Sequence, residues 1–151
     1  MPRLLIVHHT PSPATAALLQ AVIDGASDDA LAEVEVVVRP ALVAAEVEVL
    51  EADGFVLGTP ANIGYMSGAL KHFFDRIYYP CLDATRGRPF GLFVHGNDDT
   101  GGAERSVETI TSALGWKRSA ATVRATGSPV RGDLDRCQEL GATLAALLLS
   151  T

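Results

Sequence analysis

Short, continuously apolar runs alternate along the chain with longer segments in which apolar residues recur at helical spacing. The runs Leu4–Val7 and Gly54–Leu57 are apolar throughout, which is typical of strands buried on both faces of a parallel sheet. Glu33–Arg39 alternates at first and then becomes apolar, which predicts a strand nearer the sheet edge. Two later runs predict the remaining strands, at Phe90–Val94 and Trp116–Val123.

Between these runs the pattern changes to that of amphipathic helices. The predicted helices are Ala14–Ala26, a brief acidic one at Val43–Glu51, one that starts after Ser67, one carrying Val107, Ile110 and Leu114, and a closing helix from Leu134 to Leu148. Strands that alternate with helices favour a parallel sheet covered on both faces. The sequence therefore predicts an α/β fold: a three-layer αβα doubly wound sandwich around a five-stranded parallel sheet.

Length and charge narrow the class of protein. A chain of 151 residues predicts one domain, residues 1–151. The formal net charge of −6 offers no electrostatic footprint for nucleic acid or an anionic membrane, so neither is expected as a partner. The longest apolar stretch, GATLAALLL, is far shorter than a membrane span, and the N-terminus lacks a signal-peptide pattern. We therefore expect a cytoplasmic location.

The residues that commonly bind metals are not arranged for it. His8 and His9 are adjacent at a strand end and so point to opposite faces, which prevents them from chelating one ion. Cys81 and Cys137 are far apart and lack CxxC spacing, so neither a metal site nor a redox pair is expected.

The stretch Gly58–Arg76, which reads GTPANIGYMSGALKHFFDR, is the first candidate for a binding site. It follows the buried strand Gly54–Leu57 as a loop rich in turn-forming residues, and Ser67 stands where a helix N-cap is needed. In open α/β sheets ligands bind at loops that leave the carboxyl ends of central strands. The candidate binding residues of this loop are Thr59, Pro60, Ala61, Asn62, Ile63, Gly64 and Tyr65.

This pattern resembles the flavin-ring loop and following helix of the flavodoxin-like superfamily, and is most similar to its NAD(P)H-dependent FMN reductase and quinone reductase branch. The matching positions are Gly58, Thr59, Pro60, Gly64, Met66, Ser67, Leu70, Lys71, Phe74 and Asp75. The superfamily usually has an aromatic or an Arg-plus-aromatic pair where this chain has Asn62 and Ile63, and Tyr65 is an alternative aromatic nearby. The resemblance implies the flavodoxin-like strand order 2-1-3-4-5 and FMN as cofactor.

A second candidate loop lies between the first strand and the first helix. Ser12 suits the N-cap position and Pro13 the first helical position, so free N–H groups and the positive end of the helix dipole face the sheet edge. The spacing of Thr10, Ser12 and Thr15 resembles the FMN phosphate loop of flavodoxins, (S/T)-x-T-G-N-T, although Pro13 and Ala14 replace Gly and Asn. Ordinary helix capping is the alternative interpretation. The candidate residues are His9, Thr10, Ser12, Ala14 and Thr15.

A third loop, HGNDDTGG, follows the strand Phe90–Val94. Its place and part of its composition match the loop that holds the other side of the flavin ring in the superfamily. The resemblance implies binding roles for His95, Gly96, Asn97, Thr100 and Gly101. Paired aspartates in a Gly-rich turn most often serve the turn and the helix cap, so we expect no acid–base role for Asp98 and Asp99.

Two functions follow from the resemblance, and a domain that kept the fold but lost the flavin, or that binds another phosphate ligand, is a third alternative. The first is an NAD(P)H-dependent oxidoreductase in which hydride passes to flavin N5 and then to a quinone, flavin or similar small-molecule acceptor, with the flavin rather than a side chain carrying the chemistry. The second is a non-enzymatic flavodoxin-type electron carrier with a redox partner protein. The mild acidity and the scarcity of aromatics in the ring loop favour the enzyme. The oligomeric state stays open, with a homodimer slightly favoured.

Overall fold

The computed structural model describes residues 1–150 and shows a predominantly parallel sheet in the order β2-β1-β3-β5-β6. The short strand β7 also pairs with β5, and β4 pairs antiparallel with β3. The strands are β1 (Arg3–His8), β2 (Glu35–Pro40), β3 (Gly54–Asn62), β4 (Tyr65–Met66), β5 (Pro89–Gly96), β6 (Lys117–Arg118) and β7 (Val123–Thr126). The predicted doubly wound α/β fold and its strand order are confirmed.

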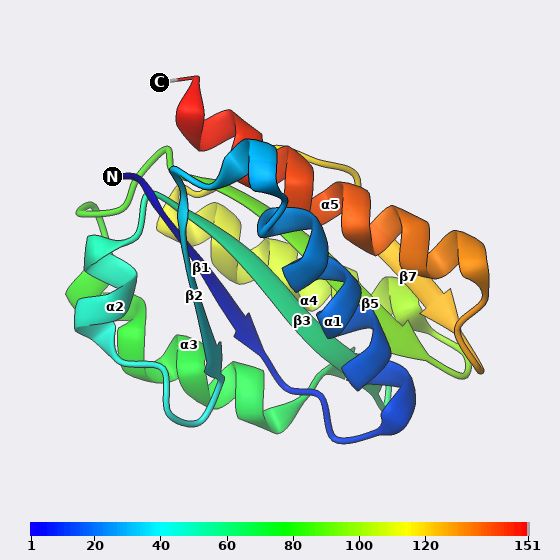
Figure 1. The fold of residues 1–151 in the computed structure, drawn as a ribbon. Helices are drawn as coiled ribbons and strands as arrows, with labels where there is room; N and C mark the ends of the chain where they lie inside the picture. Colours follow the sequence, from blue (N-terminus) through cyan, green and yellow to red (C-terminus); the bar gives the residue numbers. More distant parts are fainter. Residues whose placement is uncertain (151) are drawn as a thin grey trace.

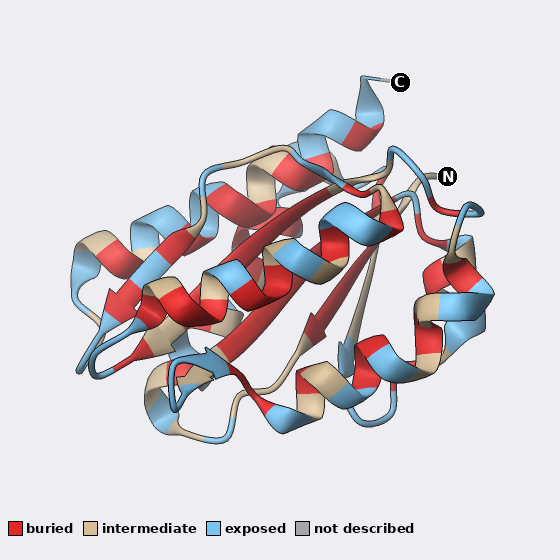
Figure 2. Cartoon of the chain, turned by 180° about the vertical axis from the view of Figure 1, so that it is seen from behind, coloured by how far each residue is buried: buried red, intermediate tan, exposed pale blue. Residues whose placement is uncertain are grey.

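Helices cover both faces of the sheet (Figure 1). On one face lie α1 (Pro13–Ala26) and α5 (Arg131–Leu149), packed on a core that includes Leu4, Ile6 and Val56. On the other lie α2 (Glu46–Glu51), α3 (Gly68–Cys81) and α4 (Thr100–Leu114), packed on residues of alternate parity in the same strands. A short 3-10 helix, Asp29–Leu31, precedes β2. Figure 2 shows the central strands buried and the helices exposed on their outer sides.

The pairing of α1 with α5 depends on two glycines. A Cβ added to Gly25 would lie 1.9 Å from the carbonyl oxygen of Gln138, and one added to Gly141 would lie 2.1 Å from that of Val22. Both distances are far below van der Waals contact, so the two helices can approach this closely only because neither position has a side chain. The closely packed pair α1 and α5 forms the helical layer that covers this face of the sheet.

The strands differ from the sequence prediction at two places. β3 continues through Asn62, whereas Gly58–Asn62 was predicted as loop, because these residues pair with β5 and β4. The predicted fifth strand Trp116–Val123 is wrong in its bounds: it divides into β6 and β7, with residues 119–122 unpaired in the strand ladder between them. The brief helix predicted at Val43–Glu51 is shorter, since α2 begins at Glu46.

Within residues 1–150, no helix combines the length and hydrophobicity that crossing a bilayer would require.

Candidate functional site at the carboxyl ends of the strands

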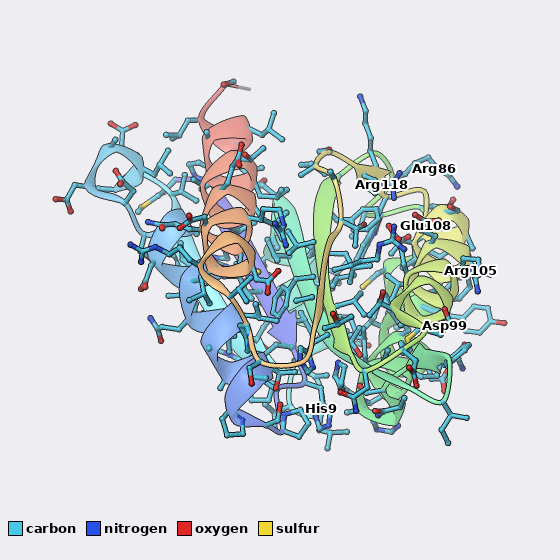
Figure 3. The ribbon with its side chains drawn as sticks, turned by 90° about the vertical axis from the view of Figure 1, so that its right-hand side faces the viewer. His9, Arg86, Asp99, Arg105, Glu108 and Arg118 are labelled. Atoms are coloured by element: carbon cyan, nitrogen blue, oxygen red, sulfur yellow. The ribbon has the colours of Figure 1, made fainter. Side chains whose placement is uncertain are left out.

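The three predicted loops meet at one edge of the sheet. His8, at the end of β1, is in register with Gly58 of β3, and Pro60 of β3 is in register with His95 of β5. The backbone N–H of His9 donates to the carbonyl of Gly58 at 2.9 Å, which joins the first loop to the second. Figure 3 shows His9 and Asp99, from the first and third loops, toward the same end of the molecule.

The second loop is a tight β-hairpin rather than an irregular loop. Asn62 pairs with Tyr65 and Ala61 with Met66, which leaves Ile63 and Gly64 as a two-residue turn. Both turn residues have positive φ, 52° for Ile63 and 72° for Gly64. Such turns suit Asn-Gly or Gly-Gly, and a β-branched residue in this region is strained. Ile63 is therefore held in an unfavourable conformation with its side chain fully exposed.

The hairpin and the third loop enclose a hollow of about 390 Å³. Its walls are formed on one side by the hairpin and on the other by the β5–α4 loop, through Ala61, Ile63, Gly64, Asn97, Asp98 and Asp99. Asn62 and Tyr65 are directly opposite each other in the hairpin, so their side chains share one face of it, and neither lines the hollow. The large apolar side chain at the hollow is thus the aliphatic Ile63, and the binding roles expected for Asn62 and Tyr65 stay predictions.

The backbone of the hairpin lies directly against the first turn of α4. A Cβ on Gly102 would lie 2.2 Å from the carbonyl oxygen of Gly64. The hydroxyl of Ser106, one turn further along α4, accepts a hydrogen bond from the N–H of Met66 at 3.0 Å. Sequence reasoning missed Ser106, although a polar residue next to Val107 on the inward side of α4 was the available signal. These contacts fix the hairpin against α4.

One of the two aspartates of the third loop, Asp99, caps a helix, as the sequence predicted. Asp99 is the N-cap of α4, and its Oδ1 accepts from the N–H of Gly102 at 2.9 Å. The carbonyl of Asp98 accepts from the N–H of Thr100 at 3.0 Å. The guanidinium of Arg105 lies 3.8 Å from the carboxylate of Asp99 and partly balances its charge. Asp98 and Asp99 thus make the wall of the hollow acidic.

The predicted residues of the third loop divide into two groups. Asn97 lines the hollow, whereas His95 is turned away from it and its Nε2 lies 2.6 Å from the carbonyl oxygen of Gly127. Gly96 permits close packing, since a Cβ there would lie 3.0 Å from that of Ala61. Thr100 is buried at the start of α4, with Gly101 beside it. Only Asn97 of this set presents a side chain to the hollow.

The first loop forms a capping box at the start of α1. The N–H of Thr15 donates to Oγ of Ser12, and the N–H of Ser12 donates to Oγ1 of Thr15 at 3.1 Å. The Thr15 hydroxyl in turn donates to the Ser12 carbonyl and is 2% exposed. The capping interpretation of Ser12 and Thr15 is thus confirmed. Thr15 positions the loop from within and does not present its hydroxyl at the surface.

The donors that remain at the surface of the first loop are few. Pro11 and Pro13 have no N–H, so the backbone donors left between His9 and the second helical position are those of Thr10 and Ala14. The Ser12 hydroxyl lies 3.0 Å from that of Thr15 and donates to it. Nδ1 of His8 lies 3.0 Å from Oγ1 of Thr10. Burial, with a smaller contribution from His9, lowers the pKa of His8, which favours the neutral imidazole. If Nδ1 carries the proton, Thr10 accepts it and keeps its own hydroxyl proton for a ligand.

Thr59 has a structural part in the second loop. Its hydroxyl donates to the carbonyl of Pro60 at 2.8 Å and accepts from the N–H of Ser67 at 2.9 Å, and the side chain is 2% exposed. Ser67 caps α3 by accepting from the N–H of Leu70. Thr59 therefore ties the end of β3 to the start of α3, and Pro60, which is partly exposed, is nearer the surface.

The sequence of the chain matches the model of a known protein family. The sequence model of a family described as NADPH-dependent FMN reductase matches residues 23–127. A search of curated proteins found no significant match.

Solved structures share the fold. A flavodoxin from the domain Archaea superposes with a TM-score of 0.82 at 19% identity, over 97% of this chain and 99% of that one. A WrbA-like flavodoxin from Agrobacterium tumefaciens gives the same score and identity over 99% of both chains. The flavodiiron core of Flv1 from Synechocystis matches at 0.82 and 20% identity, over 99% of this chain but 36% of that chain.

Proposed function

Because the chain belongs to the NADPH-dependent FMN reductase family, we propose that it binds FMN at the carboxyl edge of its sheet and acts as an NAD(P)H-dependent oxidoreductase. The acceptor is a quinone, a free flavin or a similar small molecule. Bound FMN would supply the chemistry, taking hydride from the nicotinamide and passing the electrons on. The protein's own task is to hold, orient and expose it.

The observation that carries this proposal is the hollow between the Ile63–Gly64 turn and the β5–α4 loop. It is open, has a volume of about 390 Å³, and lies at the carboxyl ends of the two central strands β3 and β5. Ligands of doubly wound sheets bind at this edge. Its exposed backbone groups and the aliphatic Ile63 side chain at its rim suit a flat heteroaromatic ring. Such a ring makes apolar contacts through its faces and hydrogen bonds through its edges.

The phosphate of FMN fits the start of α1. The positive end of this helix, the N–H groups of Thr10 and Ala14, and the hydroxyl of Thr10 are its donors. No Lys or Arg lies between residues 8 and 19, so the site relies on neutral donors and the helix dipole. The buried Thr15 hydroxyl keeps Ser12 in place.

The ring site favours an enzyme over a one-electron carrier. Ile63 is the only large apolar side chain among the residues 1–150 that line the hollow, and no aromatic side chain lines it. A ring held there would keep one face free for a nicotinamide to stack on. Asp98 and Asp99 add negative charge to one wall of this site.

The test is anaerobic reduction of the FMN-loaded protein, followed by stopped-flow absorbance, with NADPH and NADH in separate runs. We expect either nucleotide to bleach the flavin directly, and a quinone added afterwards to restore its colour. A variant with Ile63 replaced by Trp should bind FMN and react more slowly, because the indole would occupy the free face. Absence of reduction by both nucleotides would contradict the oxidoreductase and make the electron-carrier function primary.

A further inference from the structure

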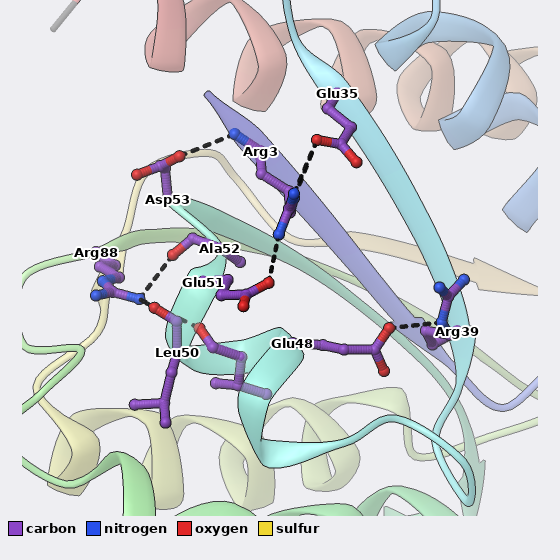
Figure 4. A network of polar contacts seen from close by, with 10 residues as sticks. Arg3, Glu35, Arg39, Glu48, Leu50, Glu51, Ala52, Asp53 and Arg88 are labelled. Carbon is purple, nitrogen blue, oxygen red and sulfur yellow. Dashed lines mark hydrogen bonds and ion pairs between the residues drawn. The ribbon is translucent and has the colours of Figure 1, made fainter. Parts of the chain in front are cut away.

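The outer edge of β2 is unpaired. β2 is the end strand of the sheet, and β1 is the only strand that pairs with it among the described residues. None of its residues is fully buried, and its three central valines are each partly exposed. Figure 4 shows β2 as the outermost strand of this side, with Glu35 and Arg39 on it. An open edge of this kind is a template for another strand.

The hydrogen bonds to β1 determine which backbone groups of β2 point outward. The N–H of Glu35 donates to the carbonyl of Pro2 at 2.9 Å, and the N–H of Ala41 donates to that of His8 at 2.7 Å. In a parallel ladder, alternate residues direct both of their backbone groups to the same neighbour. Residues 35, 37, 39 and 41 therefore bond to β1, whereas Val36 and Val38 present their N–H and carbonyl groups to the open edge.

The side chains of the strand form a self-complementary pattern. Glu35, Val37 and Arg39 lie on one face, where they border a hollow of about 220 Å³ beside the short helix α2. Read in either direction, Glu35–Arg39 has one charged end, three valines and an oppositely charged end. Two copies placed antiparallel with Val37 at the centre therefore put Glu35 of each opposite Arg39 of the other.

We propose that β2 is a dimerisation edge for a second copy of this chain, paired antiparallel across a two-fold axis through Val37. In this register Val36 of one copy is opposite Val38 of the other, and these are the residues whose backbone groups point outward. Each such pair exchanges two N–H···O bonds, so hydrogen bonding and charge select the same alignment. The two sheets become one continuous sheet, and the interface is isologous.

Neighbouring registers satisfy fewer of these conditions. A shift of one residue would bring outward-pointing groups opposite residues already bonded to β1, and it would also move the side chains to the wrong face. Placing the axis at Val38 would oppose Arg39 to Val37 and leave Glu35 without a charged partner. The charges of Glu35 and Arg39 thus disfavour other alignments of the two copies. They also disfavour pairing with unrelated strands, as charged residues on edge strands commonly do.

The charges that the dimer needs are accessible and already oriented. Nη2 of Arg3 lies 3.0 Å from Oε2 of Glu35, and Nε of Arg39 lies 2.6 Å from Oε2 of Glu48 (Figure 4). The Glu35 and Arg39 side chains stay 43% and 45% exposed, so each has free surface for a second partner. In the dimer each side would form a chain of four alternating charges, Arg3–Glu35–Arg39–Glu48, that crosses between the copies.

The proposed interface between the two β2 edges is small. A single strand edge buries less than the roughly 1,200 Å² of a stable interface, so we expect dimerisation to depend on protein concentration. Sedimentation velocity from about 1 µM to about 1 mM should show a monomer that converts to a dimer. Hydrogen exchange followed by NMR should show the amides of Val36 and Val38 becoming protected as the concentration rises, whereas those bonded to β1 are protected throughout.

Charge exchange distinguishes this interface from any other. Glu35→Arg and Arg39→Glu should each weaken self-association about tenfold or more, because like charges then oppose each other at both ends. The double variant E35R/R39E should recover it, and an equimolar mixture of the two single variants should form a heterodimer. Arg118→Glu is the matched control, since it also removes exposed ion pairs, to Glu104 and Glu108, but far from β2.

Circular dichroism melts of each variant verify that the monomer is folded. A wild-type protein that stays monomeric at about 1 mM would overturn the proposal. So would a dimer that the single charge reversals leave unchanged, because its interface would then lie elsewhere, for example on α5. Single variants that fail to combine in the mixture would contradict the antiparallel register.

Discussion

The carbonyl oxygen of Gly64 lies 2.2 Å from the position that a Cβ on Gly102 would occupy, so the hairpin and α4 are in direct backbone contact. Replacing Gly102 with Ala should push the hairpin away from α4 and strain the site. We expect a loss of about 1–3 kcal/mol in the free energy of unfolding, the usual cost of overpacking, together with weaker FMN binding. Urea unfolding and a fluorescence titration with FMN measure the two effects.

Gly68→Ala is the control for that experiment, because Gly68 begins α3 with nothing within 4 Å of an added Cβ. It should leave FMN affinity unchanged and stability equal or slightly higher, since Ala is the better helix former. If Gly102→Ala behaves like Gly68→Ala, the hairpin is not held by this contact.

The strained turn provides a second prediction. Ile63 has a φ of 52°, and Asn adopts this region far more readily than a β-branched residue. Ile63→Asn should therefore raise the free energy of unfolding by about 1 kcal/mol and reduce FMN affinity, because the lip of the hollow loses its apolar side chain. Thermal unfolding of the FMN-free protein tests the first effect. An unchanged or lower melting temperature would show that the turn is not strained.

The phosphate loop provides a third prediction, in which neighbouring threonines behave differently. Thr10→Ala should weaken FMN binding roughly tenfold to a hundredfold, the scale of a hydrogen bond to a charged group, and leave riboflavin binding unchanged. Thr15→Val should mainly reduce stability, by about 1 kcal/mol, because its buried hydroxyl serves the capping box of α1. Calorimetric titration of both ligands and thermal melts separate the two roles. Equal effects of both substitutions on FMN would contradict this division.

A fourth prediction concerns pH. Burial lowers the pKa of His8 below its ordinary value of 6.5, so the unfolded chain binds a proton at a pH where the folded protein does not. Stability should consequently fall as the pH drops below about 6.5, and His8→Gln should reduce that dependence. His72→Gln, a substitution on the exposed side of α3, is the control. Urea unfolding from pH 7.5 to pH 5 is the measurement, and a slope that His8→Gln leaves intact would exclude His8 as its source.

Much of the architecture could be predicted from hydrophobic spacing. Leu4–Val7 and Gly54–Leu57 have the continuous apolar pattern of buried parallel strands, and both are strands in the structure. The division of the last strand could not be predicted, because Trp116–Val123 contains no residue that marks the unpaired segment 119–122. The extension of β3 was missed for a related reason: Thr59 and Pro60 favour turns locally, yet pairing with β5 overrides that preference.

The candidate site was predicted at the level of loops and less well at the level of side chains. Topology alone brings the three loops together. Which side chains face the hollow depends on hairpin register, and the pairing of Asn62 with Tyr65 directs both away from it and leaves Ile63 at its lip. His95 likewise cannot be assigned from sequence, because its partner is the distant carbonyl of Gly127.

The central claim is that the edge formed by the first, second and third loops is an FMN site with a dedicated place for the phosphate. Its most direct test is isothermal titration calorimetry of the FMN-free protein with FMN and, separately, with riboflavin. We predict one FMN per chain and an affinity for riboflavin at least about tenfold lower, because only FMN engages the start of α1. Comparable affinities for the two ligands, or no binding of FMN, would contradict the account.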